Sequence, residues 1–287
     1  MRGKALIRNC LLLMTAFMVV SAHLAIAQAT SKMKKDTYWS NTQKYGLGFR
    51  IGPTITIGSI NNKADKEILS TLPKFGFNLS SQLTMPLKGS YTFAAELGYQ
   101  RGGRKMKITE SDWVVDYNYN FITSAMALRK TIQIALREDL KGEIYFGVGP
   151  NVSWFIGPGR GKIITPNGGE SKFKIEYNNY DPNAWGDFSR YFVNDPNRLL
   201  FGLDLSIGGD APVNLKQKLY GEVRFTWGHT NLGTKQTDTH LNILNFEDTM
   251  FVNLKTISFS LIYTYGFETR RNNKGGSTLK KKPQGRR

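Results

Sequence analysis

The chain has 287 residues, of which 40% are hydrophobic and 21% are charged, and its formal net charge is +17. Three positive charges lie in the first eight residues and eight follow Phe267, which leaves only +6 for residues 9–269. The body of the chain is therefore mildly basic, and its charge does not indicate a nucleic-acid-binding domain. Cys10 is the only cysteine and lies near the start, which excludes disulfides and thiolate metal sites from the rest of the chain.

Residues 1–27 have the three parts of a secretory signal peptide. Basic residues precede an apolar run over residues 11–20, and Ala25-Ile26-Ala27 supplies the small side chains of a cleavage site. The apolar run is shorter than the roughly 20 residues that a membrane-spanning helix requires. We therefore expect export, a mature chain that begins at Gln28, and a periplasmic lead over residues 28–43.

From residue 44 onward, large apolar side chains alternate with small or polar ones in segments of about ten residues or more. In the last segment, residues from Ile257 to Phe267 place six large side chains on one face and mainly Ser, Thr and Gly on the other. This period of two is typical of β-strands. The eight segments that show it cover residues 47–57, 75–85, 91–100, 113–128, 143–156, 199–208, 219–228 and 256–267.

The fourth segment is irregular. Its large side chains occupy odd-numbered positions from Trp113 to Phe121 and even-numbered positions from Ile122 to Leu128. A β-bulge inserts one extra residue and so reverses the facing of all residues that follow. We therefore predict a bulge near Phe121.

The polar faces and the connections together indicate a membrane barrel. The polar faces carry Gly, Ser, Thr and Asn with isolated charges, which suits a narrow lumen better than the Lys-rich surface of a soluble sheet. The three longest connections, residues 61–72, 157–197 and 229–248, are the first, fifth and seventh, so they share one end. Outer-membrane barrels have long loops outside and short turns in the periplasm. The sequence therefore predicts an all-β, eight-stranded antiparallel up-and-down transmembrane β-barrel over residues 44–267, in the outer membrane, with both termini periplasmic.

Four short motifs resemble those of PorT-type outer-membrane β-barrel proteins. They are Gly-x-x-x-Gly-Pro at residues 48–53, Pro86-Leu87, Ala95-Glu96-Leu97-Gly98-Tyr99 and Gly147-Val148-Gly149-Pro150. The resemblance spans residues 45–267 and implies an eight-stranded barrel, and some relatives are linked to type IX secretion and gliding. The chain departs from the common pattern because a basic tail follows Phe267, where the last strand of such a barrel would end.

Six charged residues fall on the predicted lumen face, where they could form an ion or proton path or a structural network. An unpaired charge in a confined lumen is costly, and eight strands leave room for little more than side chains. We therefore expect a network of paired charges that fills the barrel. Its predicted members are Arg50, Glu96, Glu143, Asp204, Glu222 and Arg224.

The sequence offers no convincing catalytic or cofactor site. His229 and His240 lie around the seventh connection, and Asp238 and Ser59 are the candidate partners in a rim enzyme, but nearness in sequence does not make a triad. Residues 157–162 lack the spacing of a phosphate-binding loop. We predict that the protein is not an enzyme and that it has no catalytic residue, no metal site and no cofactor.

The fifth connection is rich in aromatic residues within polar surroundings. Such a long connection is functional or mobile, and its aromatic side chains could anchor a protein or glycan, or fold over the barrel mouth as a lid. Both interpretations stay open from the sequence. The residues are Tyr177, Tyr180, Trp185, Phe188, Tyr191 and Phe192.

Residues 268–287 form a basic tail whose composition predicts disorder. In the periplasm it could be simply solvated, or it could contact anionic lipid headgroups, peptidoglycan or an acidic partner. Its basic residues are Arg270, Arg271, Lys274, Lys280, Lys281, Lys282, Arg286 and Arg287.

The sequence thus favours a membrane-anchored interaction or assembly component, linked by the resemblance to a secretion or gliding apparatus. Its expected partners are outer-membrane lipid and a protein of the envelope, not nucleic acid. A small-solute channel is the alternative, followed by a rim enzyme that modifies lipid or protein.

Overall fold

The structure is a computed structural model that describes residues 44–60, 63–87, 89–135, 141–177, 190–212, 217–241 and 250–268. The predicted signal peptide, the lead over residues 28–43 and the tail beyond residue 268 lie outside the described residues.

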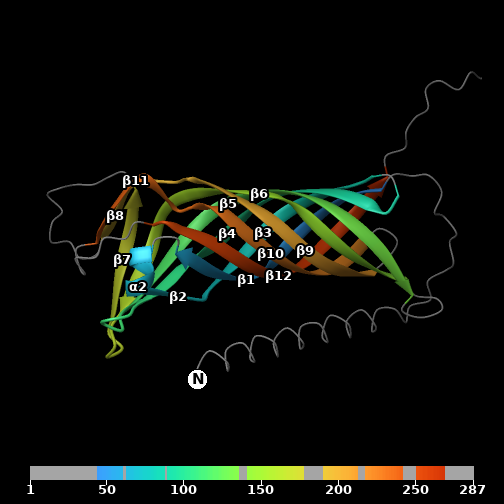
Figure 1. The fold of residues 1–287 in the computed structure, drawn as a ribbon. Coiled ribbons are helices and arrows are strands. Elements are labelled where there is room, and N and C mark those ends of the chain that lie inside the picture. The colour runs from blue at the N-terminus through green and yellow to red at the C-terminus, as the bar shows by residue number, and fades with distance from the viewer. Residues whose placement is uncertain are drawn as a thin grey trace, which may run out of the picture.

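Eight strands pair in a closed ring, and Figure 1 shows the barrel that they form. They are β1 (Lys44–Ile60), β3 (Lys74–Pro86), β4 (Tyr91–Ile108), β5 (Val114–Ala135), β6 (Lys141–Ile164), β9 (Leu199–Pro212), β10 (Gln217–Asn231) and β12 (Val252–Glu268). Each strand is antiparallel to both neighbours, in the order in which the strands follow along the chain. The sheet closes where β12 pairs with β1, from Lys44↔Glu268 to Ile60↔Val252. The predicted eight-stranded up-and-down barrel is confirmed.

Large apolar side chains point outward from all eight barrel strands, which is the reverse of a soluble protein. Phe49 and Leu97 are each 61% exposed. Soluble proteins rarely expose a continuous apolar surface of this extent, whereas a lipid-facing belt consists of such residues. We call this surface the belt; one member from each strand in turn is Phe49, Phe75, Leu97, Met126, Phe146, Phe201, Trp227 and Tyr263.

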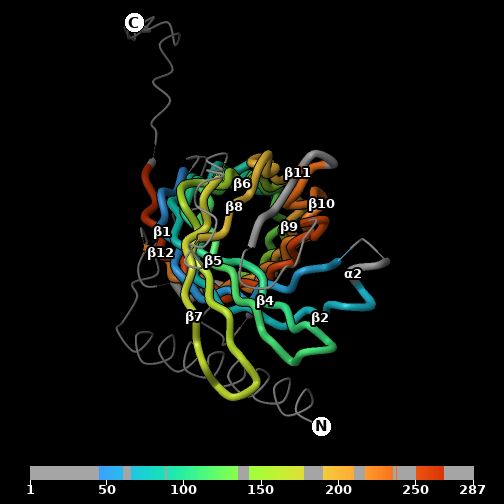
Figure 2. Tube along the Cα trace, turned by 90° about the vertical axis from the view of Figure 1, so that its left-hand side faces the viewer, coloured from blue at the N-terminus to red at the C-terminus, as the bar shows by residue number. Residues whose placement is uncertain are grey.

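The sheet continues beyond the belt at one end of the barrel. Here β2 (Leu69–Leu72) pairs with β4, and β7 (Glu170–Tyr177) pairs with β6. Strand β8 (Arg190–Pro196) runs parallel to β7, and β11 (Gly233–Leu241) pairs with β8. Figures 1 and 2 show these strands and α2 (Lys63–Ile68) gathered at this end.

We call this end the cap: α2, β2, β7, β8, β11 and residues 101–108, 114–120 and 157–164 of the long strands β4, β5 and β6. The long predicted connections therefore contain folded strands. Among the described residues, no helix is both long and apolar enough to cross a membrane.

The predicted bulge near Phe121 is wrong. The pairing of β4 with β5 runs without a shift from Tyr91↔Lys130 to Lys107↔Val114. One face of β5 stays buried throughout; its members are Val115, Tyr117, Tyr119, Phe121, Ala125, Ala127 and Arg129. The apolar residues change sides because the surroundings change: the barrel interior is polar inside the belt and apolar inside the cap.

The irregularity lies instead between β5 and β6. The register shifts between Asn118 and Asn120, where β6 contains extra residues opposite β5. Gly157, in this part of β6, has a φ of 66°, a left-handed conformation that glycine adopts without steric cost.

Candidate functional site

The inner wall of the barrel is built from small residues that make room for a few large polar ones. A Cβ atom on Gly208 would lie 2.4 Å from the ring of Tyr145, so the glycine is what allows this tyrosine to cross the lumen. A Cβ atom on Gly147 would lie 3.1 Å from the Cγ of Arg129. The small side chains predicted for the lumen face thus leave the space that the charged residues fill.

Three arginines and three carboxylates, all buried, meet in this space, so the charges balance. Glu96 of β4 is the centre, because it accepts hydrogen bonds from all three arginines. Arg50 Nη1 donates to Oε2 over 3.0 Å, and Arg129 Nη2 donates to Oε1 over 3.0 Å. Arg224 donates twice, from Nη1 to Oε2 over 2.9 Å and from Nη2 to Oε1 over 2.7 Å.

Glu222 of β10 is the second carboxylate of the network. It accepts hydrogen bonds from Arg50, from Arg129 Nη2 over 3.3 Å and from Arg224 Nε over 3.0 Å. The Tyr145 hydroxyl donates to Glu222 Oε2 over 2.5 Å. Each of the two carboxylate oxygens therefore accepts hydrogen bonds from two donors. This pairing offsets the cost of burying the charge.

Asp204 of β9 is the third carboxylate. It accepts from Arg224 Nη1 over 3.1 Å, from Asn151 Nδ2 over 3.2 Å and from the Thr226 hydroxyl over 2.6 Å. Arg129 also donates to Gln82 Oε1 over 2.9 Å. The network therefore connects seven barrel strands: β1, β3, β4, β5, β6, β9 and β10.

The structure brings five of the six predicted lumen charges together: Arg50, Glu96, Asp204, Glu222 and Arg224. The sixth predicted member, Glu143, is not among the residues that the structure brings together. It lies two residues from Tyr145 along β6, and Lys218 binds its carboxylate over 2.7 Å instead. The prediction omitted Arg129, which lies on the same buried face of β5 as Ala127. The alternation of β5 could have revealed it, had no bulge been assumed.

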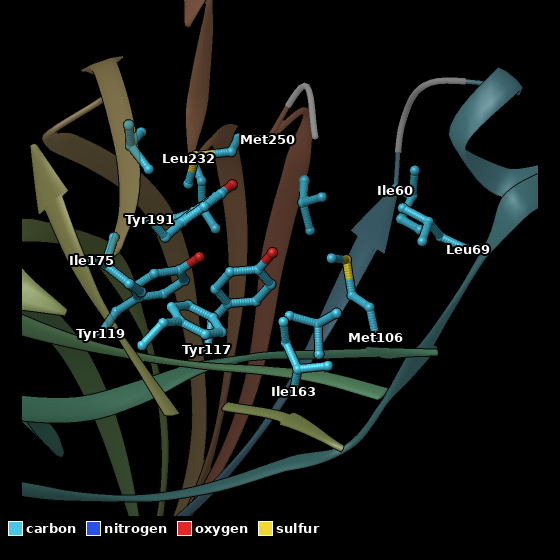
Figure 3. Close-up of a cluster of buried hydrophobic side chains, with 14 of the residues drawn as sticks. Ile60, Leu69, Met106, Tyr117, Tyr119, Ile163, Ile175, Tyr191, Leu232 and Met250 are labelled. Atoms are coloured by element: carbon cyan, nitrogen blue, oxygen red, sulfur yellow. The ribbon is translucent and has the colours of Figure 1, made fainter. Parts of the chain in front are cut away.

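An apolar core fills the cap above the network (Figure 3). Tyr117, Tyr119 and Tyr191 lie side by side, with ring centroids 6.1 Å apart for the first two and 5.5 Å apart for Tyr117 and Tyr191. Phe155 packs edge-on against Tyr119 at 5.1 Å. Aromatic pairs of this kind stabilise a core beyond their buried area.

Arg104 is fully buried among these rings. Its Nε donates to the Tyr119 hydroxyl over 3.2 Å, and its guanidinium lies 4.5 Å from the centroid of the Tyr117 ring. Such a cation–π contact is strongest where water is excluded. Burial raises the pKa of Tyr119 to about 12 and also raises the pKa of Tyr117.

The structure describes three of the six aromatic residues predicted for the fifth connection. Tyr191 and Phe192 are buried, and the Tyr177 ring packs against Phe155 at 4.7 Å. This placement favours the lid over an exposed binding surface. Tyr180, Trp185 and Phe188 lie outside the described residues, as do the eight basic residues of the tail.

A small cavity separates the network from the cap core. Its volume is about 40 Å³, and its polar lining includes Asn151, Thr226 and Thr256, while Phe121 and Leu254 supply apolar walls. At roughly 10–15 Å³ for each water, this space is enough for about three waters.

Two of the four side chains considered for a rim enzyme are described by the structure. No group of three or more His, Cys, Asp or Glu side chains that could hold a metal occurs in the described part of the chain. His229 is exposed on β10, and Ser59 is half-buried on β1. The side chains of Asp238 and His240 lie outside the described set.

A scan of protein-family models finds no match, and a search of curated proteins finds none either. Solved outer-membrane barrels are similar to the chain. OprG from Pseudomonas aeruginosa is 10% identical with a TM-score of 0.44, over 78% of this chain and 96% of that one. Neisserial surface protein A is 11% identical with a TM-score of 0.36, over 77% and 97%.

The outer membrane protease OmpT of Escherichia coli is 8% identical with a TM-score of 0.31, over 82% of this chain and 99% of that one. At such identities and scores, what these proteins do carries no argument about this chain. Its membership of the PorT-type proteins stays a prediction.

Proposed function

We propose that the protein is a non-enzymatic β-barrel of the outer membrane that anchors the cap as an interaction or assembly surface. One observation carries the proposal: side chains fill the interior at two levels, as the charge network within the barrel and as the apolar core of the cap above it. A barrel filled in this way supports a folded structure outside the membrane better than it supports transport. The belt supports insertion, because exported proteins with a lipid-facing barrel surface belong in an outer membrane.

The alternative, a small-solute channel, requires a continuous polar path. The six interlocked charges and the aromatic rings of the cap argue against such a path. The measurement is single-channel recording in planar bilayers. We expect the wild-type protein to give no stable conductance, whereas regular conductance steps would favour the channel.

The partner that we propose is a protein of the cell envelope, bound by the cap and by the basic tail. The resemblance to PorT-type barrels favours a secretion or gliding apparatus as the assembly, and this part of the proposal rests on the four short motifs alone.

The rim enzyme is the weakest alternative. It is abandoned if His229→Ala and His240→Ala leave all envelope phenotypes unaltered.

Site-specific photo-crosslinking in native membranes tests the cap as the working surface. A crosslinking amino acid replaces Asn167, exposed in the turn between β6 and β7, or Glu110, exposed between β4 and β5. The control replaces Leu97 in the belt, which faces lipid. We expect protein adducts of defined mass from the cap positions only. Their absence from both cap positions, or equal adducts from Leu97, would contradict the proposal.

A further inference from the structure

The outer face of the cap sheet carries basic residues in rows that cross neighbouring strands. In one row, Lys105, Asp116, Lys162 and Lys172 are successive cross-strand partners on β4, β5, β6 and β7. In the adjacent row, Asn118, Arg160, Lys174 and Arg190 are partners on β5, β6, β7 and β8. The basic side chains of both rows alternate with buried residues of the cap core and face outward, whereas Asp116 between them is buried and pairs with Lys74. We call this surface the basic face.

The basic face begins where the aromatic edge of the belt ends. Tyr99, Ile122 and Trp154 form a cross-strand row of the belt. Arg101 follows Tyr99 by two residues on the same face of β4, about 7 Å further along the strand. Lys105 follows after four more residues. Aromatic side chains of this kind mark the level of lipid headgroups, so the basic face lies at and just above that level.

Only some of the basic residues are neutralised. Lys162 pairs with Glu170 over 2.7 Å, Lys174 with Glu176 over 2.8 Å, and Asp116 with Lys74 over 2.5 Å. Arg101, Lys105, Arg160 and Lys172 make no ion pair with any described residue. The surface therefore keeps a positive charge that neighbouring carboxylates do not cancel.

We infer that the basic face binds the phosphate groups of lipids in the leaflet that surrounds the base of the cap. Arginine and lysine beside a membrane surface are attracted to anionic headgroups, and the guanidinium fork matches phosphate geometry. A lipid fits better than a soluble polyanion because the charges adjoin the aromatic edge on the lipid-facing side. The inference rests on the proposed membrane insertion.

The test uses the full-length protein in neutral detergent micelles, titrated with dioctanoyl phosphatidic acid or dioctanoyl phosphatidylcholine. We expect tighter binding of phosphatidic acid, and a loss of about fivefold for each basic residue removed, thus about 25-fold for Arg160→Gln/Lys172→Gln. Raising the ionic strength should reduce the preference. The matched control, Lys66→Gln/Lys130→Gln, removes two exposed lysines outside the basic face and should change the affinity less than twofold.

Equal affinities for the two lipids, or equal losses in the two double variants, would overturn the inference. Soluble polyphosphate that binds through Arg160 and Lys172 more tightly than phosphatidic acid would also overturn it, in favour of a soluble polyanion. The heat-modifiable mobility of unboiled samples checks that both variants fold. Flotation with neutral vesicles separates the two proposals: failure to insert contradicts the proposed function, whereas insertion without headgroup preference contradicts only this inference.

Discussion

Arg224 and Glu96 face each other across the lumen and are joined by two hydrogen bonds of 2.9 and 2.7 Å, one to each carboxylate oxygen. They come from β10 and β4, which are separated by three strands on either side of the barrel. The pair therefore connects opposite walls. Two parallel charged hydrogen bonds are the strongest form of such a contact, and they fix the relative height of the two strands.

Removing one partner of this pair should destabilise the barrel strongly. Arg224→Gln leaves three buried carboxylates with two arginines, and an uncompensated buried charge costs about 3–5 kcal/mol. Glu96→Gln leaves the opposite excess and should cost a similar amount. The measurement is the free energy of unfolding in urea, with the protein inserted in vesicles.

The double variant Glu96→Gln/Arg224→Gln restores the charge balance, so its cost should fall short of the sum of the single costs by about 1–3 kcal/mol. Lys162→Gln, the control, breaks an exposed ion pair with Glu170 and should change the free energy of unfolding far less than either single variant of the buried pair. Additive costs in the double variant would show that the two residues act independently.

Gly149 lies where two strands approach closely. A Cβ atom there would be 1.7 Å from the carbonyl oxygen of Met126 on the neighbouring strand, so Gly149→Ala forces the backbones of β5 and β6 apart. We expect a loss of about 1–3 kcal/mol or more in the free energy of unfolding. Gly221→Ala is the matched control, because a Cβ atom there meets nothing within 4 Å. Its effect should stay within about 0.5 kcal/mol.

A charge in the belt tests directly whether this surface meets lipid. Leu97→Arg should lower the free energy of unfolding in vesicles by about 1–3 kcal/mol, between the cost of a cation at the bilayer midplane and at the interface, because Leu97 lies two residues below Tyr99 at the aromatic edge. Ser171→Arg places the same side chain on an exposed position of β7 in the cap, where water is available, and should be nearly neutral. Equal effects at the two positions would mean that Leu97 does not face lipid.

The barrel could be predicted from the sequence because alternation is a property of each strand by itself. Arg50, Glu96 and Arg224 each occupy the polar face of their own strand, and this alternation is sufficient to predict that they point inward. What alternation cannot supply is height along the axis, because the stagger between strands arises only when the sheet closes. Glu143 has the parity of Tyr145 but lies nearer the end of β6, beside Lys218.

The arrangement of the cap could not be predicted from alternation alone. β7 does alternate, with buried Phe173 and Ile175 next to outward lysines, but β11 consists almost wholly of polar residues. β7 and β8 pair in parallel, and β8 pairs with β11, which is distant in sequence. The alternation of β5 indicates an aromatic face, but it does not tell whether that face points into the barrel or away from it. Odd-numbered residues such as Tyr117 and Tyr119 suit an interior only once that interior is known to be apolar, and this depends on the cap itself.

Alkaline pH should loosen the cap through Tyr119, which is fully buried there and whose pKa burial raises to about 12. The pKa of tyrosine in an unfolded chain is about 10. Below pH 10 the hydroxyl is protonated in both states and its contribution to stability is complete. Between pH 10 and 12 the unfolded chain releases the proton and the folded cap does not, so stability falls as the pH rises, by about 2–3 kcal/mol in all. Unfolding free energies measured from pH 9 to pH 12 should show this decline in the wild-type protein and a smaller one in Tyr119→Phe, which has no group to ionise. A decline of equal size in the two proteins would mean that other groups cause the alkaline sensitivity.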